Sequence, residues 1–165
     1  MKNRKLILAA LFAALTCVAT FLVRIPSVIG GYINLGDGMV LLSGWFLGPV
    51  GALAAAVGSA LADISAGYII YAPVTFLIKG LMALVAYGLI RGIKKNKITA
   101  NIISGTLSEV IMIAGYFVFE WIIYDFGGAI ANIPANAVQA VAGITAATLL
   151  YSVFKRNIEK IFEDK

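Results

Sequence analysis

The chain has 165 residues, of which 61% are hydrophobic and 13% are charged, and it carries a formal net charge of +5 at neutral pH. Its mean hydropathy of +0.96 excludes a soluble domain, because a domain of this size has too much surface to hide so many apolar side chains. Long apolar runs between short polar breaks are typical of a helical protein that crosses the membrane several times.

The basic residues predict membrane topology and argue against nucleic-acid binding. Eleven of the 13 lie at the two ends or in one internal segment: Lys2, Arg4, Lys5, Arg91, Lys94, Lys95, Lys97, Lys155, Arg156, Lys160 and Lys165. Short basic loops stay on the cytoplasmic side of a membrane. We therefore expect both termini and the segment 91–97 to be cytoplasmic. The sequence contains no nucleic-acid-binding motif, so we expect no nucleic-acid partner.

Six apolar segments follow one another along the chain. The first begins after the basic start at Met1–Lys5, and it lacks a convincing cleavage site, so we expect a membrane helix there and not a cleaved signal peptide. Strand-like alternation is absent, which favours helices throughout. The predicted helices are Leu6–Val23, Gly38–Leu47, Val50–Ile64, Pro73–Ile90, Thr99–Tyr124 and Pro134–Phe154.

The connections between these segments are polar or rich in glycine. A loop containing Pro26, Gly30 and Gly31 follows the first helix, and a polar and aromatic turn, Ser65–Ala72, follows the third. We predict a glycine-rich loop over Asp125–Ile133. Pro73 and Pro134 then begin helices, since proline is tolerated in the first turn.

The second segment is too short to cross a bilayer alone, because the ten residues of Gly38–Leu47 rise only about 15 Å. If Gly38–Ile64 were one broken crossing, segment 91–97 would lie outside. A hairpin turning at Gly48–Pro49 makes the number of crossings even and keeps every basic segment inside. We therefore predict an all-α membrane protein of six transmembrane helices in a single domain, residues 1–165, with cytoplasmic N- and C-termini and a short second helix. Whether the hairpin spans fully or is re-entrant stays open.

Polar and aromatic residues of the predicted helices and of the adjoining loops converge on the outer half of the membrane. Ionisable groups are expensive in lipid and therefore mark functional sites. A polar cluster confined to one half indicates a pocket open to the outside, because a pore needs polar lining across the full thickness. The candidate substrate-binding residues are Asn34, Asp37, Asp63, Tyr71, Lys79, Tyr116, Glu120, Asn132, Asn136 and Gln139.

Several of these residues also have structural explanations. Lys79 could pair with Glu120 or Asp63 to neutralise a buried charge. Asp37 could cap the second helix or pair with Arg24. Asp63 could be a structural partner at the end of the third helix.

The amides and aromatic residues have such explanations too. Asn136 and Gln139 could link helices. Tyr68, Tyr71, Trp121 and Tyr124 could form an interfacial aromatic belt. Glu109 lies near the membrane midplane with no obvious cation in reach, and desolvation could keep it protonated.

The sequence argues against an enzyme. It has no histidine, which excludes HExxH metal sites and Ser-His triads, and it has no phosphate-binding loop of the Walker type. Its one cysteine, Cys17, allows no internal disulfide and is expected to be a small buried apolar residue. We expect no cofactor and no metal. An intramembrane enzyme would need a nucleophile and a base that the chain does not offer.

Two sequence stretches together resemble one family. They are YINLGDGMVLLSGWFLGPVGALAAAVGSALADI from Tyr32 and GYIIYAPVTFLIKGLMALVAYG from Gly67. The chain resembles the membrane-embedded substrate-binding (S) components of energy-coupling factor (ECF) vitamin transporters, in particular the group linked to hydroxymethylpyrimidine, pyridoxine or riboflavin. The likeness covers nearly the whole chain in length and helix layout, and its specific part is Tyr32–Lys79.

The resemblance implies a six-helix bundle that binds a vitamin near its outer face, with the loop after the first helix lying over the site. It also implies docking to a transmembrane (T) component through small residues of the first helix, where A-x-x-x-A occurs twice, at Ala9/Ala13 and Ala10/Ala14. Two cytoplasmic ATPases would complete the complex, and the loaded S component would topple in the membrane to deliver its cargo. A multi-pass protein of a bacterial plasma membrane is expected.

The expected function is high-affinity substrate binding for an ATP-driven importer of a small water-soluble vitamin or precursor. Acids, amides, one lysine and aromatic rings suit hydroxymethylpyrimidine or pyridoxine first, and riboflavin third. The alternative is a stand-alone secondary transporter driven by a gradient, or a small channel, for which Glu109 is the one coupling residue that the sequence offers.

Overall fold

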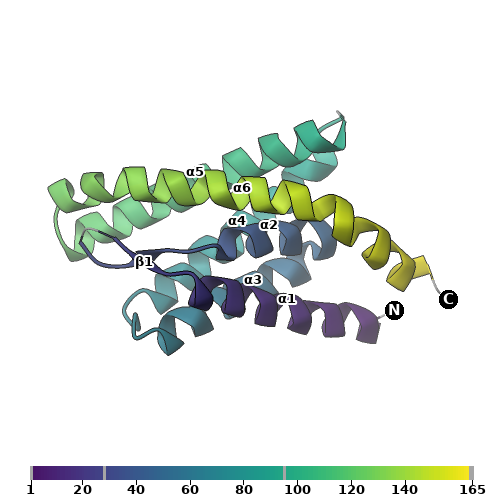
Figure 1. Ribbon diagram of the computed structural model, residues 1–165, viewed down its shortest axis with the longest axis horizontal. Coiled ribbons are helices and arrows are strands. Elements are labelled where there is room, and N and C mark those ends of the chain that lie inside the picture. The colour runs from purple at the N-terminus through teal and green to yellow at the C-terminus, as the bar shows by residue number, and fades with distance from the viewer. Residues whose placement is uncertain (1, 28, 95, 164–165) are drawn as a thin grey trace.

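The computed structural model describes residues 2–27, 29–94 and 96–163. Across these residues the chain forms six helices and one pair of short strands (Figure 1). In chain order they are α1 (Lys2–Leu22), β1 (Ile25–Pro26), β2 (Tyr32–Ile33), α2 (Gly36–Leu47), α3 (Pro49–Ser65), α4 (Ala72–Gly92), α5 (Lys97–Ile123) and α6 (Phe126–Glu163). The predicted all-α fold with six helices and a short second helix is confirmed.

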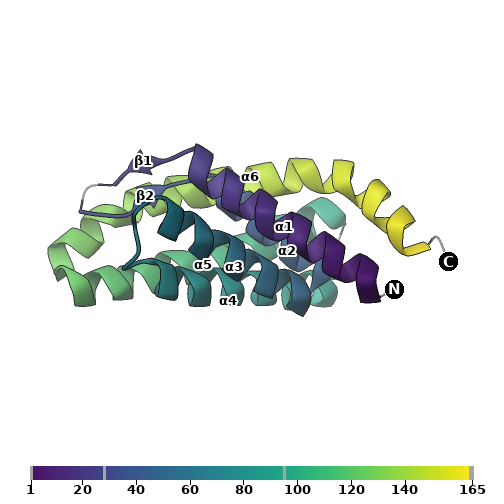
Figure 2. The same cartoon turned by 90° about the horizontal axis from the view of Figure 1, so that it is seen from below.

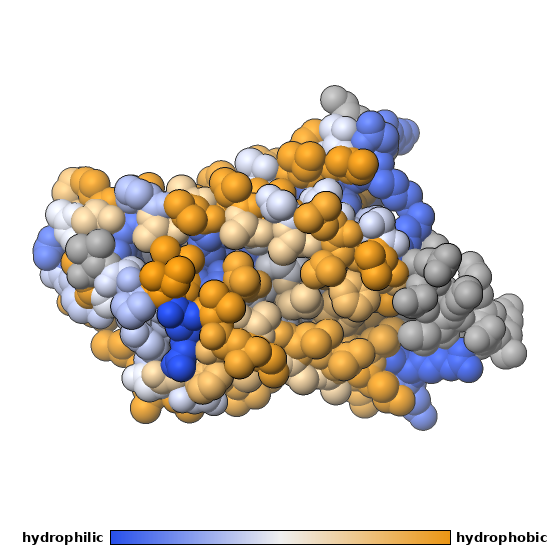
Figure 3. All heavy atoms as spheres, viewed as in Figure 1, coloured by the Kyte–Doolittle hydropathy of each residue, from blue (hydrophilic) through white to orange (hydrophobic). Residues whose placement is uncertain are grey.

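Four of the helices are long and apolar enough to cross a membrane: Asn3–Leu22, Ala72–Gly92, Lys97–Ile123 and Phe126–Lys155. Large apolar side chains point outward from them, as Leu22 and Ile122 do with 73% and 76% of their surface exposed. Apolar residues cover most of the visible face, and hydrophilic residues gather toward the ends (Figure 3). A bilayer would cover such a surface. The predicted cytoplasmic orientation of the termini stays a prediction.

The short α2 and α3 form the predicted helical hairpin. Its turn lies at Gly48, whose positive φ of 63° suits glycine, and Pro49 follows in the first turn of α3. The Ser43 hydroxyl donates to the Gly51 carbonyl at 2.6 Å across the turn. With 12 residues, α2 rises only about 18 Å. It packs against α1, α3, α4 and α6, which enclose it on several sides.

The sixth helix begins earlier than the sequence analysis predicts. The glycine-rich segment Asp125–Ile133 is helical from Phe126, and Pro134 lies inside α6, so the predicted loop and the predicted helix start are wrong. Asp125 explains the early start, because its carboxylate accepts from the Gly128 N–H at 2.8 Å and its carbonyl from the Ala129 N–H at 3.1 Å. Capping at Asp125 and burial of Ala129 therefore outweigh the low helix propensity of glycine and proline.

Two strands of two residues each interrupt the loop after α1. They pair antiparallel, with Ile25 opposite Ile33 and Pro26 opposite Tyr32. Strands this short leave no alternating pattern in the sequence. The β1–β2 hairpin lies at the same end of the bundle as the α5–α6 connection, whereas both termini lie at the other end (Figures 1 and 2). We call the end with β1 and β2 the hairpin end and the opposite end the terminal end.

The contact between α1 and α3 depends on Gly58. A side-chain carbon on this residue would overlap the Ala13 carbonyl oxygen and come within 3.0 Å of the Thr16 β-carbon. We predict that Gly58→Ala lowers the free energy of unfolding by about 1–3 kcal/mol through overpacking, measured by thermal unfolding in detergent. Gly88→Ala on α4 is the matched control, since no atom lies within 4 Å of its added carbon. Equal melting temperatures for the two variants would contradict this account.

Candidate functional site

A small polar pocket lies at the hairpin end of the bundle. Its volume is about 30 Å³, which holds water but is far below the about 300–1,000 Å³ of sites for small molecules. The covering segment between α1 and α2 forms one side, and α3, α4, α5 and α6 form the others. The lining residues are Ser27, Gly31, Tyr32, Asn34, Asp63, Tyr71, Thr75, Tyr116, Glu120, Asn136 and Gln139.

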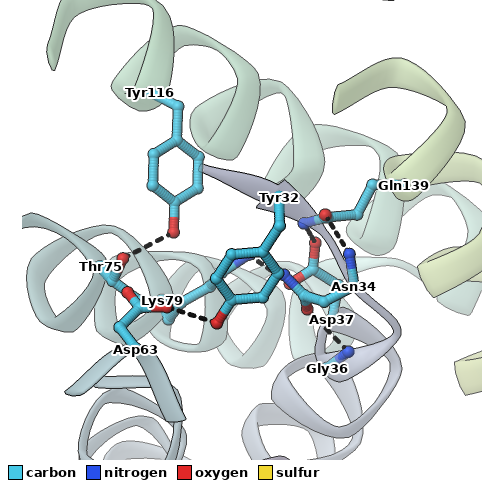
Figure 4. A network of polar contacts seen from close by, with 9 residues as sticks. All are labelled: Tyr32, Asn34, Gly36, Asp37, Asp63, Thr75, Lys79, Tyr116 and Gln139. Carbon is cyan, nitrogen blue, oxygen red and sulfur yellow. Dashed lines mark hydrogen bonds and ion pairs between the residues drawn. The ribbon is translucent and has the colours of Figure 1, made fainter. Parts of the chain in front are cut away.

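A buried ion pair forms the floor beneath this pocket (Figure 4). The Lys79 ammonium on α4 pairs with the Asp37 carboxylate on α2, and only 2% and 0% of the two side chains are exposed. The Gln139 amide on α6 donates to the second Asp37 oxygen at 2.7 Å. Gln139 in turn accepts from the Asn34 N–H at 2.8 Å. The network thus joins three helices to the segment that covers the pocket.

The observed contacts correct three interpretations of the charged residues. Lys79 pairs with Asp37, not with Glu120 or Asp63. Asp37 does not cap α2: Leu35 precedes the helix, and the Gly36 N–H is satisfied by the Asn34 side chain at 2.9 Å. The Asp37 carboxylate is therefore available to Lys79. Arg24 does not reach Asp37, because its guanidinium lies over the Phe21 ring at 4.2 Å.

Two carboxylates line the pocket itself. Asp63 accepts from the Tyr32 hydroxyl at 2.6 Å, and Glu120 accepts from the Asn132 amide at 2.9 Å. The other oxygens, Asp63 Oδ2 and Glu120 Oε2, are buried and have no well-formed hydrogen bond within the described residues. Thr75 and Tyr71 lie beside them. The pocket therefore offers two carboxylate oxygens without well-formed hydrogen bonds to the donor groups of a ligand.

Aromatic rings and hydroxyls complete the walls. The Tyr71 ring lies 6.4 Å from the Tyr116 ring, whose hydroxyl shares a hydrogen bond of 2.9 Å with Thr75. Tyr32 stacks at a tilt on Tyr68, with 4.7 Å between ring centres. Burial and the hydrogen bond to Asp63 raise the pKa of Tyr32 above its ordinary value. Tyr32 therefore keeps its proton and acts as the donor to Asp63.

Asn132 lies behind the pocket and holds its cover in place. Besides its bond to Glu120, its amide lies 3.3 Å from the Ser27 hydroxyl and 3.4 Å from the Gly30 carbonyl. Asn132 is buried and does not line the pocket. It positions Glu120 and the covering segment together.

Glu109 lies against the ion pair, one layer deeper than the pocket. Its side chain is 2% exposed, and neither carboxyl oxygen has a hydrogen-bond partner within the described residues. A side-chain carbon on Gly143 would meet Glu109 Oε1 at 2.9 Å and the Asp37 β-carbon at 2.8 Å, so glycine at this place on α6 lets the two acids approach. Within the described chain, no cluster of three or more metal-ligating side chains accompanies them.

The alanines of α1 divide between two faces. Ala9 is buried and Ala13 is partly buried toward α3. Ala10 and Ala14 are exposed. Of the two A-x-x-x-A pairs, Ala10/Ala14 is thus the one on the outer surface of the bundle.

Comparison with known proteins decides the family. The sequence model of the family described as ECF-type riboflavin transporter, S component, matches residues 1–156. The chain belongs to this family. S components are substrate-binding subunits of vitamin transporters, and the chain is accordingly a membrane transport protein and not an enzyme.

Two relatives and one solved structure are also similar to the chain. An uncharacterized protein of Pyrococcus woesei is 38% identical over 149 residues, which cover 88% of this chain and 98% of that protein. The thiamine precursor transporter HmpT of Lactococcus lactis is 28% identical over 157 residues, covering 93% and 89% of the two chains. A solved bacterial ECF transporter S component is 21% identical and superposes with a TM-score of 0.72 over 96% of this chain and 99% of that chain, which shows the shared fold.

In this S component, seven of the ten predicted residues line the pocket. Asp37 and Lys79 form its floor, and Asn132 lies behind it. Four further residues line the pocket and are not among those predicted: Ser27, Gly31, Tyr32 and Thr75. Thr75 could have been predicted from the sequence, since it lies one helical turn before Lys79 on the same face. Tyr32 could not, because its position depends on how the β1–β2 hairpin folds back over the bundle.

The floor of the site can be tested by charge removal. We predict that Lys79→Met destabilises the protein by about 3–5 kcal/mol, because it leaves Asp37 as a buried, uncompensated charge. Asp37→Asn combined with Lys79→Met should recover most of this loss, since asparagine still accepts from Gln139. Thermal unfolding in detergent measures both. A double variant less stable than Lys79→Met alone would contradict the ion-pair floor.

Proposed function

We propose that this chain is the high-affinity substrate-binding subunit of an ATP-driven ECF importer in a plasma membrane, and that its cargo binds in the pocket at the hairpin end. The ten residues predicted from the sequence would serve it in three ways. The lining residues contact the cargo, Asp37 and Lys79 hold the floor, and Asn132 holds the cover.

One observation carries this proposal: a polar pocket with unpaired acceptors lies at one end of an otherwise apolar bundle. Asp63 and Glu120 each present a buried oxygen without a well-formed hydrogen bond, next to the rings of Tyr71 and Tyr116. Leaving such oxygens unpaired costs about 1–3 kcal/mol each, more where they are charged. A ligand that donates hydrogen bonds and stacks on aromatic rings offsets this cost.

The favoured cargo is a small heterocycle that carries amino or hydroxyl donors, with hydroxymethylpyrimidine or pyridoxine first and riboflavin next. Lys79 is already neutralised by Asp37, so the pocket has acidic and not basic character. A relative at 28% identity is named a thiamine precursor transporter, which supports a pyrimidine. The family description names riboflavin. The closed volume of about 30 Å³ needs less opening for the smaller molecule.

Calorimetry on the purified protein tests the cargo. We predict tight binding of one compound, without ATP, from a panel of B vitamins and their precursors. Glu120→Gln should weaken it about tenfold or more, because a hydrogen bond to a charged group contributes about 1.5–3 kcal/mol. Tyr116→Phe should also weaken binding.

Tyr87→Phe makes the same chemical change at the terminal end of the bundle, where the tyrosine contacts Arg91, and should leave the affinity unchanged. Absence of heat with every compound, or an equal loss for Tyr116→Phe and Tyr87→Phe, would contradict the proposed site.

The partners proposed for this subunit are a T component and two cytoplasmic ATPases. Ala10 and Ala14 lie on the exposed face of α1, where small side chains let another helix approach closely. Ala9 is buried inside the bundle, and Ala13 is partly buried against α3. The docking surface proposed here is therefore the Ala10/Ala14 pair.

We predict that Ala10→Leu and Ala14→Leu preserve vitamin binding and abolish uptake in cells that contain the T component and the two ATPases. Ala114→Leu, an equal change at an exposed position of α5, should preserve both. Normal uptake by both α1 variants would exclude this docking surface. Gradient-driven uptake into vesicles that contain this chain alone would favour the stand-alone transporter.

A further inference from the structure

A second cavity lies at the terminal end of the bundle, opposite the pocket described above. Its volume is about 210 Å³, and it opens between the last turns of α4, the first turns of α5 and the facing side of α6. The lining residues are Trp45, Ile90, Ile93, Lys97, Ala100, Asn101 and Tyr151.

The cavity exists because α2 is short. This helix ends at Leu47, whereas α4 continues to Gly92. Trp45, near the end of α2, forms one wall. Its indole N–H donates to the Ser104 hydroxyl at 3.0 Å, and its ring meets the Tyr151 ring edge-on with centres 5.8 Å apart. These contacts fix the wall, so the cavity has a defined shape.

Asn101 gives the cavity an unused hydrogen-bonding atom. The side chain is only 1% exposed, and its Oδ1 has no partner within the described residues. A buried acceptor of this kind is costly unless a donor satisfies it. Trp45 cannot be this donor, because its indole N–H already donates to the Ser104 hydroxyl. The vacant acceptor therefore indicates a ligand with a hydroxyl or similar donor.

The mouth of the cavity favours an anion. Lys97 lies at the first position of α5, so its ammonium adds to the positive end of that helix dipole. Arg91 and Lys94 belong to the same basic segment. The opposite wall is apolar and contains Ile90 and Ile93. Tryptophan and tyrosine beside such a mouth are typical of the level of lipid headgroups.

We propose that this cavity binds one anionic phospholipid whose headgroup carries hydroxyl groups, such as phosphatidylglycerol. The phosphate lies beside Lys97 and the start of α5, and a headgroup hydroxyl donates to Asn101 Oδ1. The glycerol backbone and the first acyl carbons pack along Ile90, Ile93 and Trp45. Basic pockets between helices at the cytoplasmic side bind acidic headgroups in this way.

Native mass spectrometry of the full-length protein tests the proposal. Protein in detergent is mixed with phosphatidylglycerol, phosphatidylcholine or free glycerol phosphate, and the bound adducts are counted. We expect one phosphatidylglycerol per chain and a higher melting temperature with that lipid, without either effect from the other two. Equal retention of phosphatidylcholine would overturn the selectivity, and equal binding of glycerol phosphate would show an anion site without lipid recognition.

Two variants of equal charge change provide the control. Lys97→Gln should lower retention of phosphatidylglycerol about fivefold, the loss expected for one basic residue near an acidic headgroup. Lys94→Gln removes the same charge from an exposed position that does not line the cavity, and should change little. Equal losses would indicate unspecific attraction and overturn the site.

Asn101→Asp keeps the size of the side chain but repels the phosphate, so retention should fall further than in Lys97→Gln. Size-exclusion profiles and the melting temperature without lipid show whether each variant is folded. A folded Asn101→Asp variant that retains phosphatidylglycerol as the unmodified protein does would refute the role of Asn101.

Discussion

The buried ion pair between Asp37 and Lys79 is the constraint on which the site depends. It ties the half-length α2 to α4, and Gln139 extends it to α6 and to the backbone of Asn34. Neither charge can exist alone in this environment, because an unpaired buried ion costs several kcal/mol. The start of α2 is therefore fixed, and with it the floor and one side of the pocket.

Below this floor the bundle is closed. Val40 and Met82 follow Asp37 and Lys79 by one helical turn, are fully buried and belong to one apolar cluster. The serines farther along bond locally, as Ser43 does to Gly51 and Ser108 to Ser104. Apolar side chains therefore lie directly beneath the ion pair, and these two serines are bonded to nearby backbone carbonyls. A pocket closed at its base suits a binding subunit that moves as a body better than a channel.

Much of the fold could be predicted from the sequence, because apolar length and the positions of basic residues are local signals. The turn at Gly48–Pro49 was predicted correctly for this reason. The partner of Lys79 was predicted wrongly as Glu120 or Asp63. Both acids were expected at the same membrane level as Asp37, and only the packing of α2 against α4 selects Asp37. The helical start at Asp125 was also missed, because glycine and proline composition concealed a cap. Tyr32 depends on a hairpin whose strands are too short to leave a pattern.

The two ends of the molecule thus differ in chemistry: acids and aromatic rings at the hairpin end, lysine and a vacant amide at the terminal end. The central claim is that the vitamin binds at the hairpin end, between Tyr32, Asp63 and Glu120. An experimental structure of the protein with hydroxymethylpyrimidine or pyridoxine tests it most directly. The account predicts ligand density in contact with Asp63 or Glu120 under a displaced covering segment. Density elsewhere in the bundle, with this pocket unchanged, would contradict it.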